Sequence, residues 1–526
     1  MTGAAALGTR RPVPPAVAPA EWTTHAEAAL AARLDAAATR PAPATLAAIT
    51  HRGRVLAVAA HGEPRRDGAP TARGTVFRIA SMSKSFLAAT ALSLRDEGLL
   101  DLHAPAADYV PEVAAAHFEG TPVRLTLDAL LSNRSGLGED NAWGDDHLGD
   151  SRAQLGALVA AGLPLSAPPG TEYQYSNIGQ SLVGRAIEAV TGRPVEEVIR
   201  ARMLDPLGLA DTRPSADAYA PGTDLASGFR TFDGGATFTP EPYVGSGALA
   251  CIGSLFSTVD DIATWMQFLG SAFGDAPAAA GVLAAASRRE MQTAHTLMNV
   301  TTGEPNLARA GHGFGLAGAG YGYGLVVEHD RRFGRIVQHA GGLPGFSSHM
   351  RWHPATGIGV VVFGNSDAFR AGGVATPLLA DMLGRVNAPA AVVRPWPETL
   401  AAARRIDDLL VAGRPLTDAG DLLAGNVLTD VPAGVRAQRI AAAHAEVGAV
   451  RTDIAPFEAR VLTAPDAAAL RWIVPCERGA LVCDVRLVGL PDPIVQSVSI
   501  AVADATGRRP RDETPGIADH HAVDLD

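Results

Sequence analysis

The N-terminal part of the chain alternates between patterns typical of helices and patterns typical of strands. Apolar residues recur at helical spacing from Glu21 to Ala38, which predicts a helix there. Alternating positions on either side of a glycine turn predict a β hairpin over Ala47–Ala60. Thr75–Ile79 is predicted to be a short strand. It leads into a long apolar helix over Ser81–Glu97, which Gly98 ends.

Helical patterns dominate the middle of the chain, and strand patterns follow residue 320. The predicted helices are Leu125–Leu131, Gln154–Ala161, Ile178–Thr191, Val195–Met203 and Ser257–Phe268. The predicted strands, separated by turn residues, are Tyr321–His329, Arg335–His339, Ser347–His353 and Gly357–Asn365. A helical middle with strands on both sides predicts an α/β sandwich-like domain, in which one antiparallel sheet receives strands from both ends.

A second domain is predicted after the proline- and alanine-rich segment Asn387–Pro397. Its predicted elements are the helices Glu398–Ala412 and Gly434–Glu446 and the strands Phe457–Leu462, Ala469–Pro475, Ala480–Val488 and Val495–Ala501. We therefore expect one large domain over residues 1–392, with residues 1–20 loose. We also expect a small α+β domain over residues 393–526, with a frayed acidic tail.

Composition favours a globular enzyme over a fibrous, disordered or nucleic-acid-binding protein. Of the 526 residues, 47% are apolar and only 19% are charged, which fits large packed cores. The net charge is −11 and the basic residues are scattered, so no nucleic-acid partner is expected. The chain shows neither a signal-peptide pattern nor an apolar run of transmembrane length. The low, odd number of three cysteines argues against a disulfide framework. We therefore expect a cytoplasmic protein that does not bind membranes.

Lys84 is the most informative single residue, because it is the only lysine among 44 Lys and Arg residues. It lies three residues after Ser81, at the start of the predicted long helix. Residues at this spacing share one face of a helix and lie within reach of each other. Arg stays protonated at any accessible pH, whereas a buried Lys can lose its proton. The pair therefore suits a serine nucleophile activated by a nearby base.

Two further motifs lie where the chain can reach a substrate. Tyr175 and Asn177 follow a proline turn and precede a predicted helix, so they occupy a connecting segment that can border a cleft. The segment His339–Gly342 ends a predicted strand. Its glycines, Gly341 and Gly342, are expected to let a substrate backbone approach closely.

These motifs resemble, in the same order, those of the serine β-lactamase and penicillin-recognising superfamily. The three motifs are Ser81-x-x-Lys84, Tyr175-Ser176-Asn177 and His339-Ala340-Gly341, and supporting stretches are Leu130–Leu137, Gly253–Thr258 and Leu343–Phe346. The chain is most similar to the class C-like branch, which includes carboxylesterases, D-stereospecific peptidases and transacylases. The resemblance covers roughly residues 45–370. It implies a β-lactamase/transpeptidase-like α/β sandwich, and it does not extend to the C-terminal domain.

The resemblance also implies a role for each motif residue. Ser81 is the nucleophile that becomes acylated, and either Lys84 or Tyr175 accepts its proton. The pKa of Lys84 should fall in a desolvated site near a helix N-terminus. Asn177 is expected to hydrogen-bond Lys84 and the substrate amide. The backbone N–H groups of Ser81 and Gly342 are expected to form an oxyanion hole.

His339 departs from the pattern of the superfamily. β-Lactamases and transpeptidases usually carry Lys at this position, where its charge holds the carboxylate of the substrate. An imidazole is neutral or partly charged near pH 7, so we expect carboxylate-bearing substrates to bind less strongly. This departure favours esters, amides and peptides, and it leaves β-lactamase or DD-peptidase activity as the alternative.

Two loops are expected to shape specificity. Gly138–Asp150 is strongly acidic and carries Trp143. Beside an active site it would attract an amine-bearing substrate, and the alternative is a solvated run of charges. Gly303–Gly324 is glycine-dense and suits a flap over the cleft. Three other histidines have no metal-ligand spacing and are interpreted as structural: His295, His312 and His349.

The sequence thus predicts a serine hydrolase or acyltransferase that needs no cofactor and no metal. Its expected substrates are small esters, amides or short peptides, as for a D-amino-acid peptidase or amidase, or for a carboxylesterase. The alternative from another class is a sensor or binding module, in which the serine is acylated once and stays acylated. No pattern in the sequence indicates an oligomeric state.

Overall fold

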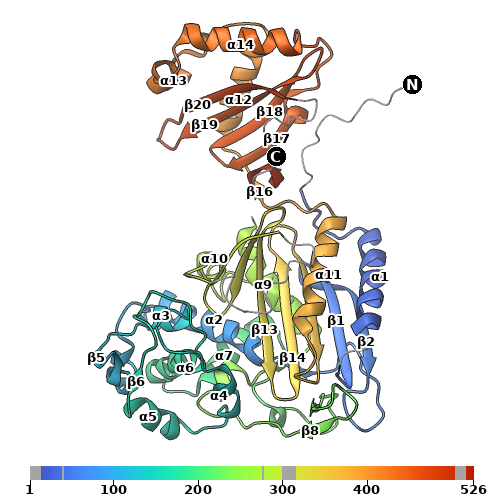
Figure 1. Ribbon diagram of the computed structural model, residues 1–526, viewed down its shortest axis with the longest axis vertical. Helices are drawn as coiled ribbons and strands as arrows, with labels where there is room; N and C mark the ends of the chain where they lie inside the picture. Colours follow the sequence, from blue (N-terminus) through green and yellow to red (C-terminus); the bar gives the residue numbers. More distant parts are fainter. Residues whose placement is uncertain (1–12, 38–40, 275–277, 299–314, 504–516, 526) are drawn as a thin grey trace. The chain divides into compact units, whose positions relative to one another are not determined.

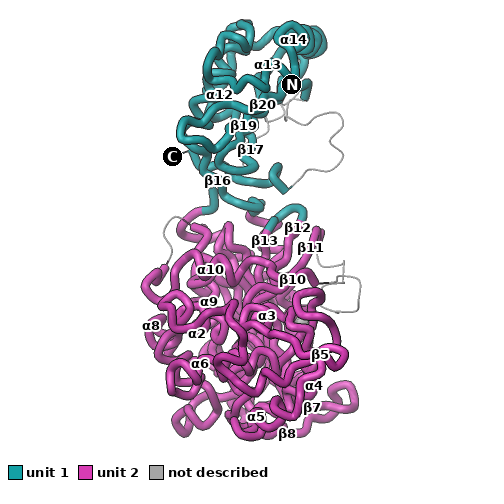
Figure 2. Tube along the Cα trace, turned by 90° about the vertical axis from the view of Figure 1, so that its left-hand side faces the viewer, with its two compact units in different colours: residues 1–14, 331–334, 387–526 teal, residues 15–330, 335–386 magenta. Residues whose placement is uncertain are grey.

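The computed structural model describes residues 13–37, 41–274, 278–298, 315–503 and 517–525. The chain divides into a larger unit, residues 15–330 and 335–386, and a smaller unit made mainly of residues 387–526 (Figure 2). The predicted boundary at residue 392 implies that residues 393–526 fold on their own, which stays a prediction. Among the described residues, no helix has both the length and the apolar character needed to cross a membrane.

An eight-stranded sheet is the centre of the larger unit (Figure 1). Its strands, in spatial order, are β10 (Thr296–Leu297), β11 (Leu316–Tyr321), β12 (Val326–Asp330), β13 (Gly334–Leu343), β14 (Phe346–His353), β15 (Ile358–Gly364), β1 (Ala44–His51) and β2 (Arg54–Gly62). β1 pairs antiparallel with β15, with Ala48 opposite Val361. The N-terminal hairpin therefore joins the C-terminal strands, as the sequence predicts.

Helices cover both faces of this sheet, which explains why every residue of β1 is buried. The covering helices are α1 (Ala20–Ala37) and α11 (Ala371–Arg385) on one face and α2 (Ser83–Asp96) and α9 (Val259–Gly270) on the other. The alternation along β14 separates the two faces. Ser348 contacts the turn before α2, whereas Arg351 donates to Thr376 of α11. Trp265 of α9 stacks on Phe86 of α2, with ring centroids 4.0 Å apart, and this packing fixes α2 against the core.

A helical region lies between the N-terminal and C-terminal strands. Its helices are α3 (Leu127–Leu131), α4 (Asn141–Asp146), α5 (Arg152–Ala160), α6 (Asn177–Thr191) and α7 (Val195–Ile199). Ser176 caps α6 by accepting a hydrogen bond from Gly179 N at 3.0 Å. The predicted helix at Ser81 begins with a 3-10 turn, Ala80–Met82, before the α-helix starts at Ser83. Gly98 follows its end with φ +74°, as expected.

The prediction of a single strand over Tyr321–His329 is wrong. A tight turn separates β11 from β12, and a hydrogen bond from Gly322 N to Leu325 O at 2.8 Å closes it. Gly324 in this turn has φ +66°, and a Cβ atom there would lie 2.4 Å from Lys84 O. Only glycine fits, because the turn packs directly against the start of α2. Alternation along the sequence does not reveal such a tertiary contact.

In its described residues, the smaller unit contains a four-stranded antiparallel sheet and three α-helices. Its strands are β17 (Val461–Asp466), β18 (Ala469–Pro475), β19 (Ala480–Val488) and β20 (Ile494–Ala503), and its helices are α12 (Pro397–Val411), α13 (Gly425–Asp430) and α14 (Ala433–Val447). Trp472 of β18 is fully buried, and its Nε1 donates to Asp407 of α12 at 2.9 Å. The predicted strand Phe457–Leu462 begins later, after a 3-10 turn.

Candidate active site

Ser81 lies on a strained turn at the start of α2. β3 (Phe77–Arg78) leads into this turn, and Ala80 has φ +48°, a left-handed value that is uncommon for residues other than glycine. Strain of this kind persists where the surrounding packing holds a side chain in a required position. Here Ser348 Oγ donates to Ile79 O at 2.7 Å and fastens the turn to β14. The Ser81 side chain is thereby fixed, with 6% of its surface exposed.

Lys84 is fully buried beside Ser81. Its Nζ donates to Ser81 Oγ at 3.0 Å and to Ile252 O at 3.1 Å. Nζ also lies 4.8 Å from the centroid of the Tyr175 ring. Burial lowers the pKa of Lys84 from 10.5 to about 7, against the opposing effect of the nearby Asp145 carboxyl. A substantial fraction of the amine is therefore unprotonated near neutral pH.

Tyr175 contacts both catalytic candidates. It is partly buried, and burial raises the pKa of its phenol well above the usual value. Tyr321 raises this pKa further, while a hydrogen bond with Ser81 acts in the opposite direction. The phenol therefore carries its proton at neutral pH. Of the two bases that the sequence leaves open, Lys84 is the one whose pKa matches the task.

His339 is 4% exposed and belongs to an aromatic cluster. Its Nε2 lies 3.1 Å from the hydroxyl of Tyr321, and its Nδ1 lies 2.6 Å from Ala340 O. The carbonyl only accepts, so Nδ1 carries the proton and donates, while Nε2 accepts from Tyr321. Burial, and then the charge of Lys84, lower the pKa of His339 to about 3. The imidazole is therefore neutral, and it provides no cation for a substrate carboxylate.

Asn177 is the first residue of α6 rather than part of the connecting segment. Its Oδ1 is buried and has no hydrogen-bond partner, so the predicted bond to Lys84 is absent. α4 packs closely on this side chain: a Cβ atom on Gly144 would lie 2.7 Å from Asn177 Cβ and Nδ2. The Nδ2 group lies 3.4 Å from Asn141 O. The unsatisfied oxygen leaves Asn177 able to accept a bond from a substrate amide, which stays a prediction.

Gly341 is required for a different reason from the one predicted. A Cβ atom there would lie 2.1 Å from Ser348 Oγ and 2.3 Å from Ile79 O, so the chain's own backbone occupies the space. Gly341 lets β13 approach the turn that carries Ser81. Gly342, by contrast, is exposed, and no atom lies within 4 Å of where its Cβ would be. The close approach of a substrate is therefore expected at Gly342.

The acidic loop Gly138–Asp150 divides into a structural and a site-facing part. Asp140 accepts hydrogen bonds from Asn177 N at 2.6 Å and from Ile178 N at 2.9 Å, so it caps α6. Asp145 is 9% exposed, and its Oδ1 has no hydrogen-bond partner. Burial raises its pKa, and the charge of Lys84 opposes that rise. Asp145 was not singled out by the sequence, where it is one of several acidic residues in a run.

Tyr321 is a second residue that motif reasoning missed. It is fully buried at the end of β11, and its ring centroid lies 6.3 Å from that of Tyr175 and 6.0 Å from that of His339. The only signal in the sequence is an aromatic residue before a glycine turn. Its hydroxyl donates to His339, and its ring packs edge-on against that of Tyr175.

The remaining predictions concern residues away from Ser81. His295 stacks on Tyr323 with ring centroids 4.1 Å apart, and His349 is buried within β14. His312 lies outside the described residues, as does most of the predicted flap Gly303–Gly324. The described part of that flap belongs to β11 and the turn after it. Within the described ranges, no group of three or more His, Cys, Asp or Glu side chains is placed to hold a metal ion.

Comparison with known proteins shows which family the chain resembles. The family model described as Beta-lactamase matches residues 28–382. Esterase EstB from Burkholderia gladioli is 33% identical over 204 residues, which are 35% of this chain and 51% of that protein. The D-alanyl-D-alanine-carboxypeptidase/endopeptidase AmpH from Escherichia coli (strain K12) is 30% identical over 207 residues, 38% of this chain and 50% of that protein. The chain thus spans about half the length of the curated relatives it matches.

Solved structures show the same fold. The octameric penicillin-binding protein homologue from Pyrococcus abyssi matches with a TM-score of 0.56 and 19% identity, over 91% of this chain and 99% of that chain. At this identity the likeness shows the fold alone, and it confirms the predicted α/β fold. The matched part, 91% of the chain, is longer than the larger unit. The likeness in fold therefore includes part of the smaller unit as well.

Proposed function

Because the chain belongs to the beta-lactamase family, we propose that it is a serine hydrolase or acyltransferase acting through an acyl-enzyme on Ser81. The observation that carries this proposal is the 3.0 Å contact between Ser81 Oγ and the fully buried amine of Lys84. A buried amine with a lowered pKa next to a hydroxyl is what activation of a serine nucleophile requires.

Acylation begins with Lys84 in its neutral form. As Ser81 Oγ attacks the substrate carbonyl carbon, the new O–C bond forms and the hydroxyl proton moves to Lys84 Nζ. The carbonyl π electrons collect on the oxygen, which becomes an oxyanion. When the tetrahedral intermediate collapses, the bond to the leaving group breaks, and the leaving group takes the proton back from Lys84. Tyr175, which is neutral and hydrogen-bonded to Ser81, is positioned to relay that proton.

Deacylation repeats these steps with another nucleophile. A water molecule, or an amine or alcohol in an acyl transfer, attacks the ester carbonyl on Ser81, and Lys84 accepts its proton. The proton then returns to Ser81 Oγ as the O–C bond breaks, which regenerates the free enzyme. The oxyanion of each step is proposed to accept hydrogen bonds from the backbone N–H groups of Ser81 and Gly342. The left-handed backbone at Ala80 and the open space at Gly342 support this assignment.

The charges around Ser81 support a preference for substrates without a carboxylate. His339 is neutral, while Asp145 adds a carboxyl on the side of α4. Small esters, amides and peptides with a free amine fit this site better than β-lactams do. Of the activities named for relatives, that of the esterase EstB fits it better than that of the carboxypeptidase/endopeptidase AmpH. β-Lactamase or DD-peptidase activity is the competing proposal.

Turnover measurements on a matched pair of serine variants test this function. We expect the wild type to release many equivalents of p-nitrophenol per site from p-nitrophenyl esters, and a fluorophosphonate probe to modify Ser81 once per chain. Ser81→Ala should abolish both signals, while Ser93→Ala, on the same helix, should keep both. A single burst without turnover would instead support the sensor alternative. A labelled residue other than Ser81 would contradict the proposed nucleophile.

A further inference from the structure

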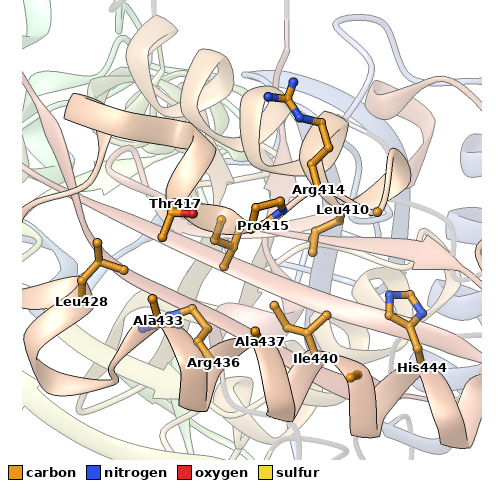
Figure 3. Close-up of a pocket in the computed structure, with 13 residues that line it drawn as sticks. Leu410, Arg414, Pro415, Thr417, Leu428, Ala433, Arg436, Ala437, Ile440 and His444 are labelled. Atoms are coloured by element: carbon orange, nitrogen blue, oxygen red, sulfur yellow. The ribbon is translucent and has the colours of Figure 1, made fainter.

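The smaller unit contains an open groove of about 370 Å³. One wall is α14, which contributes Ala433, Arg436, Ala437, Ile440, Ala441 and His444. The opposite wall is the end of α12 and the segment after it, including Leu410, Arg414 and Leu416, and Leu428 of α13 closes one end (Figure 3). A volume of this size is within the range of small-molecule sites in proteins.

The face of α14 that lines the groove is unusual for a helix that packs on a sheet. Its lining residues follow helical spacing, so they form one continuous stripe along the helix. Such a stripe normally carries large apolar side chains that fill the space beneath the helix. Here Ala433, Ala437 and Ala441 in the stripe are small and exposed. Ile440 and Ala443 are partly buried against the core, and Val447 is the one buried residue among the 15 of α14. The stripe therefore leaves apolar surface uncovered beside Leu410 and Leu416.

The ionisable side chains that line the groove are all basic. None of the 13 lining residues is Asp or Glu, whereas Arg414, Arg436 and His444 are basic. Arg414 forms an ion pair with Asp418 at 2.7 Å. Arg436 donates only to backbone carbonyls, Val427 O at 2.8 Å and Val498 O at 3.1 Å, and its Nε is buried without a partner. In the part of the chain that the structure describes, no carboxylate pairs with this guanidinium, so its charge is uncompensated.

We propose that this groove binds a single-chain amphipathic anion, a medium-chain carboxylate whose head lies at Arg436 and whose tail lies along Ala437, Ile440 and Ala441. Apolar walls favour a hydrocarbon tail, and an uncompensated cation favours an anionic head. Two of the guanidinium nitrogens already donate to carbonyls, which suits a singly charged head group. From Arg436 to His444 the helix rises about 12 Å, which matches a tail of roughly eight to ten carbons. The site is independent of the chemistry proposed at Ser81.

Calorimetric titration of the full chain with three ligands of equal tail length tests the chemical class. We expect decanoate to bind once per chain, and decanol to bind about tenfold more weakly because it lacks the charge. Decyltrimethylammonium should bind more weakly still. Octanoate should bind about tenfold more weakly than decanoate, because it buries two fewer methylenes. Absence of saturable binding of monomeric decanoate, or binding of the cation as tight as that of the anion, would overturn the proposal. Decanoate binding only above its micelle concentration would do the same.

Matched variants on α14 locate the site. Ala437→Phe places a ring in the groove and should weaken decanoate binding about tenfold or more. Ala442→Phe, on the exposed part of the same helix outside the groove, should leave it unchanged. Arg436→Gln should weaken binding, while Arg439→Gln next to it should not. Equal affinities within either pair would place decanoate elsewhere and refute the assignment. If Arg436→Gln fails to fold, the phenylalanine pair and the comparison of head groups still decide the outcome.

Discussion

Two buried cations, one in each unit, show how the same kind of burial leads to opposite chemistry. Lys84 in the larger unit donates to a hydroxyl and to a backbone carbonyl, and burial brings its pKa to about 7. Arg460 in the smaller unit is 4% exposed and is held by both oxygens of Asp407, whose side chain also accepts from Trp472. A buried Lys with neutral hydrogen-bond partners can lose its proton, whereas an Arg stays protonated and here is held by a carboxylate. Residue type and partners together make Lys84 a candidate base and Arg460 a structural cation.

Lys84→Arg tests the reactive one of the two buried cations, and we expect the largest effect from this variant. Arg keeps the charge and most of the length but stays protonated, so no base remains to accept the proton of Ser81. We predict a loss in kcat/KM of about 10³-fold or more for a p-nitrophenyl ester, with an unchanged circular dichroism spectrum. The matched control is Arg460→Lys, which should leave kcat/KM unchanged. Activity of Lys84→Arg within a few-fold of wild type would contradict the role of Lys84.

Asp407→Ala tests the structural cation, Arg460, by removing the carboxylate that holds it. Removing the carboxylate leaves the buried guanidinium of Arg460 uncompensated, which should lower the free energy of unfolding by about 3–5 kcal/mol. Replacing both Asp407 and Arg460 by Leu should recover most of that loss, because no charge is then buried. Denaturant unfolding measures both changes. A decrease below about 1 kcal/mol for Asp407→Ala would mean that the pair behaves like a surface ion pair.

His339→Lys adds a permanent cation near Ser81, where the native site has a neutral imidazole. A charge-assisted bond to a carboxylate contributes roughly 1.5–3 kcal/mol, so selectivity should shift about ten- to a hundredfold towards carboxylate-bearing substrates. The measurement is the ratio of kcat/KM for a neutral ester to that for a chromogenic cephalosporin. The wild type should favour the ester, and the variant should move towards the cephalosporin. A wild type that prefers the cephalosporin would support the β-lactamase alternative.

Asp145→Asn should produce the smallest of these effects, a shift in the pH profile. The base must be neutral, so kcat/KM of the wild type should rise with pH through the Lys84 pKa of about 7. The charge of Asp145 raises that pKa, so removing it should move the rise in kcat/KM to lower pH. Asp146→Asn, one residue further on and exposed, is the matched control and should shift the profile less. A rise that moves to higher pH in Asp145→Asn would contradict this electrostatic coupling.

Signals in the sequence were sufficient for most of the helices, for one sheet with strands from both ends of the domain, and for the pairing of Ser81 with Lys84. The helix that carries both residues follows from apolar periodicity, and the contact between them follows from helical geometry. The turn between β11 and β12 was missed because its apolar residues continue the strand pattern. It exists because Gly324 fits against the backbone of Lys84, a contact between segments far apart in the chain.

Side-chain environments were the harder part to predict, because they depend on which segments pack together. Asn177 makes no hydrogen bond to Lys84, because α4 packs against its side chain. No signal in the sequence near residue 177 predicts that contact with α4. Asp145 differs from its acidic neighbours only in being buried. The alanines of α14 look like ordinary helix formers in the sequence, and only the fold shows that they border an open groove. Burial depends on tertiary packing. Sequence motifs therefore identify the reactive residues better than they identify the side chains that surround those residues.

The pKa of Lys84 tests the proposed base most directly, and the composition of the chain makes it measurable. Because Lys84 is the only lysine, protein grown with lysine labelled with carbon-13 at Cε gives one side-chain resonance, and its chemical shift against pH yields the pKa without assignment. We expect a midpoint of about 7 in the folded protein. In the denatured protein we expect the ordinary value of about 10.4. A folded-state midpoint near that ordinary value would mean that Lys84 stays protonated, and it would contradict its role as the base for Ser81.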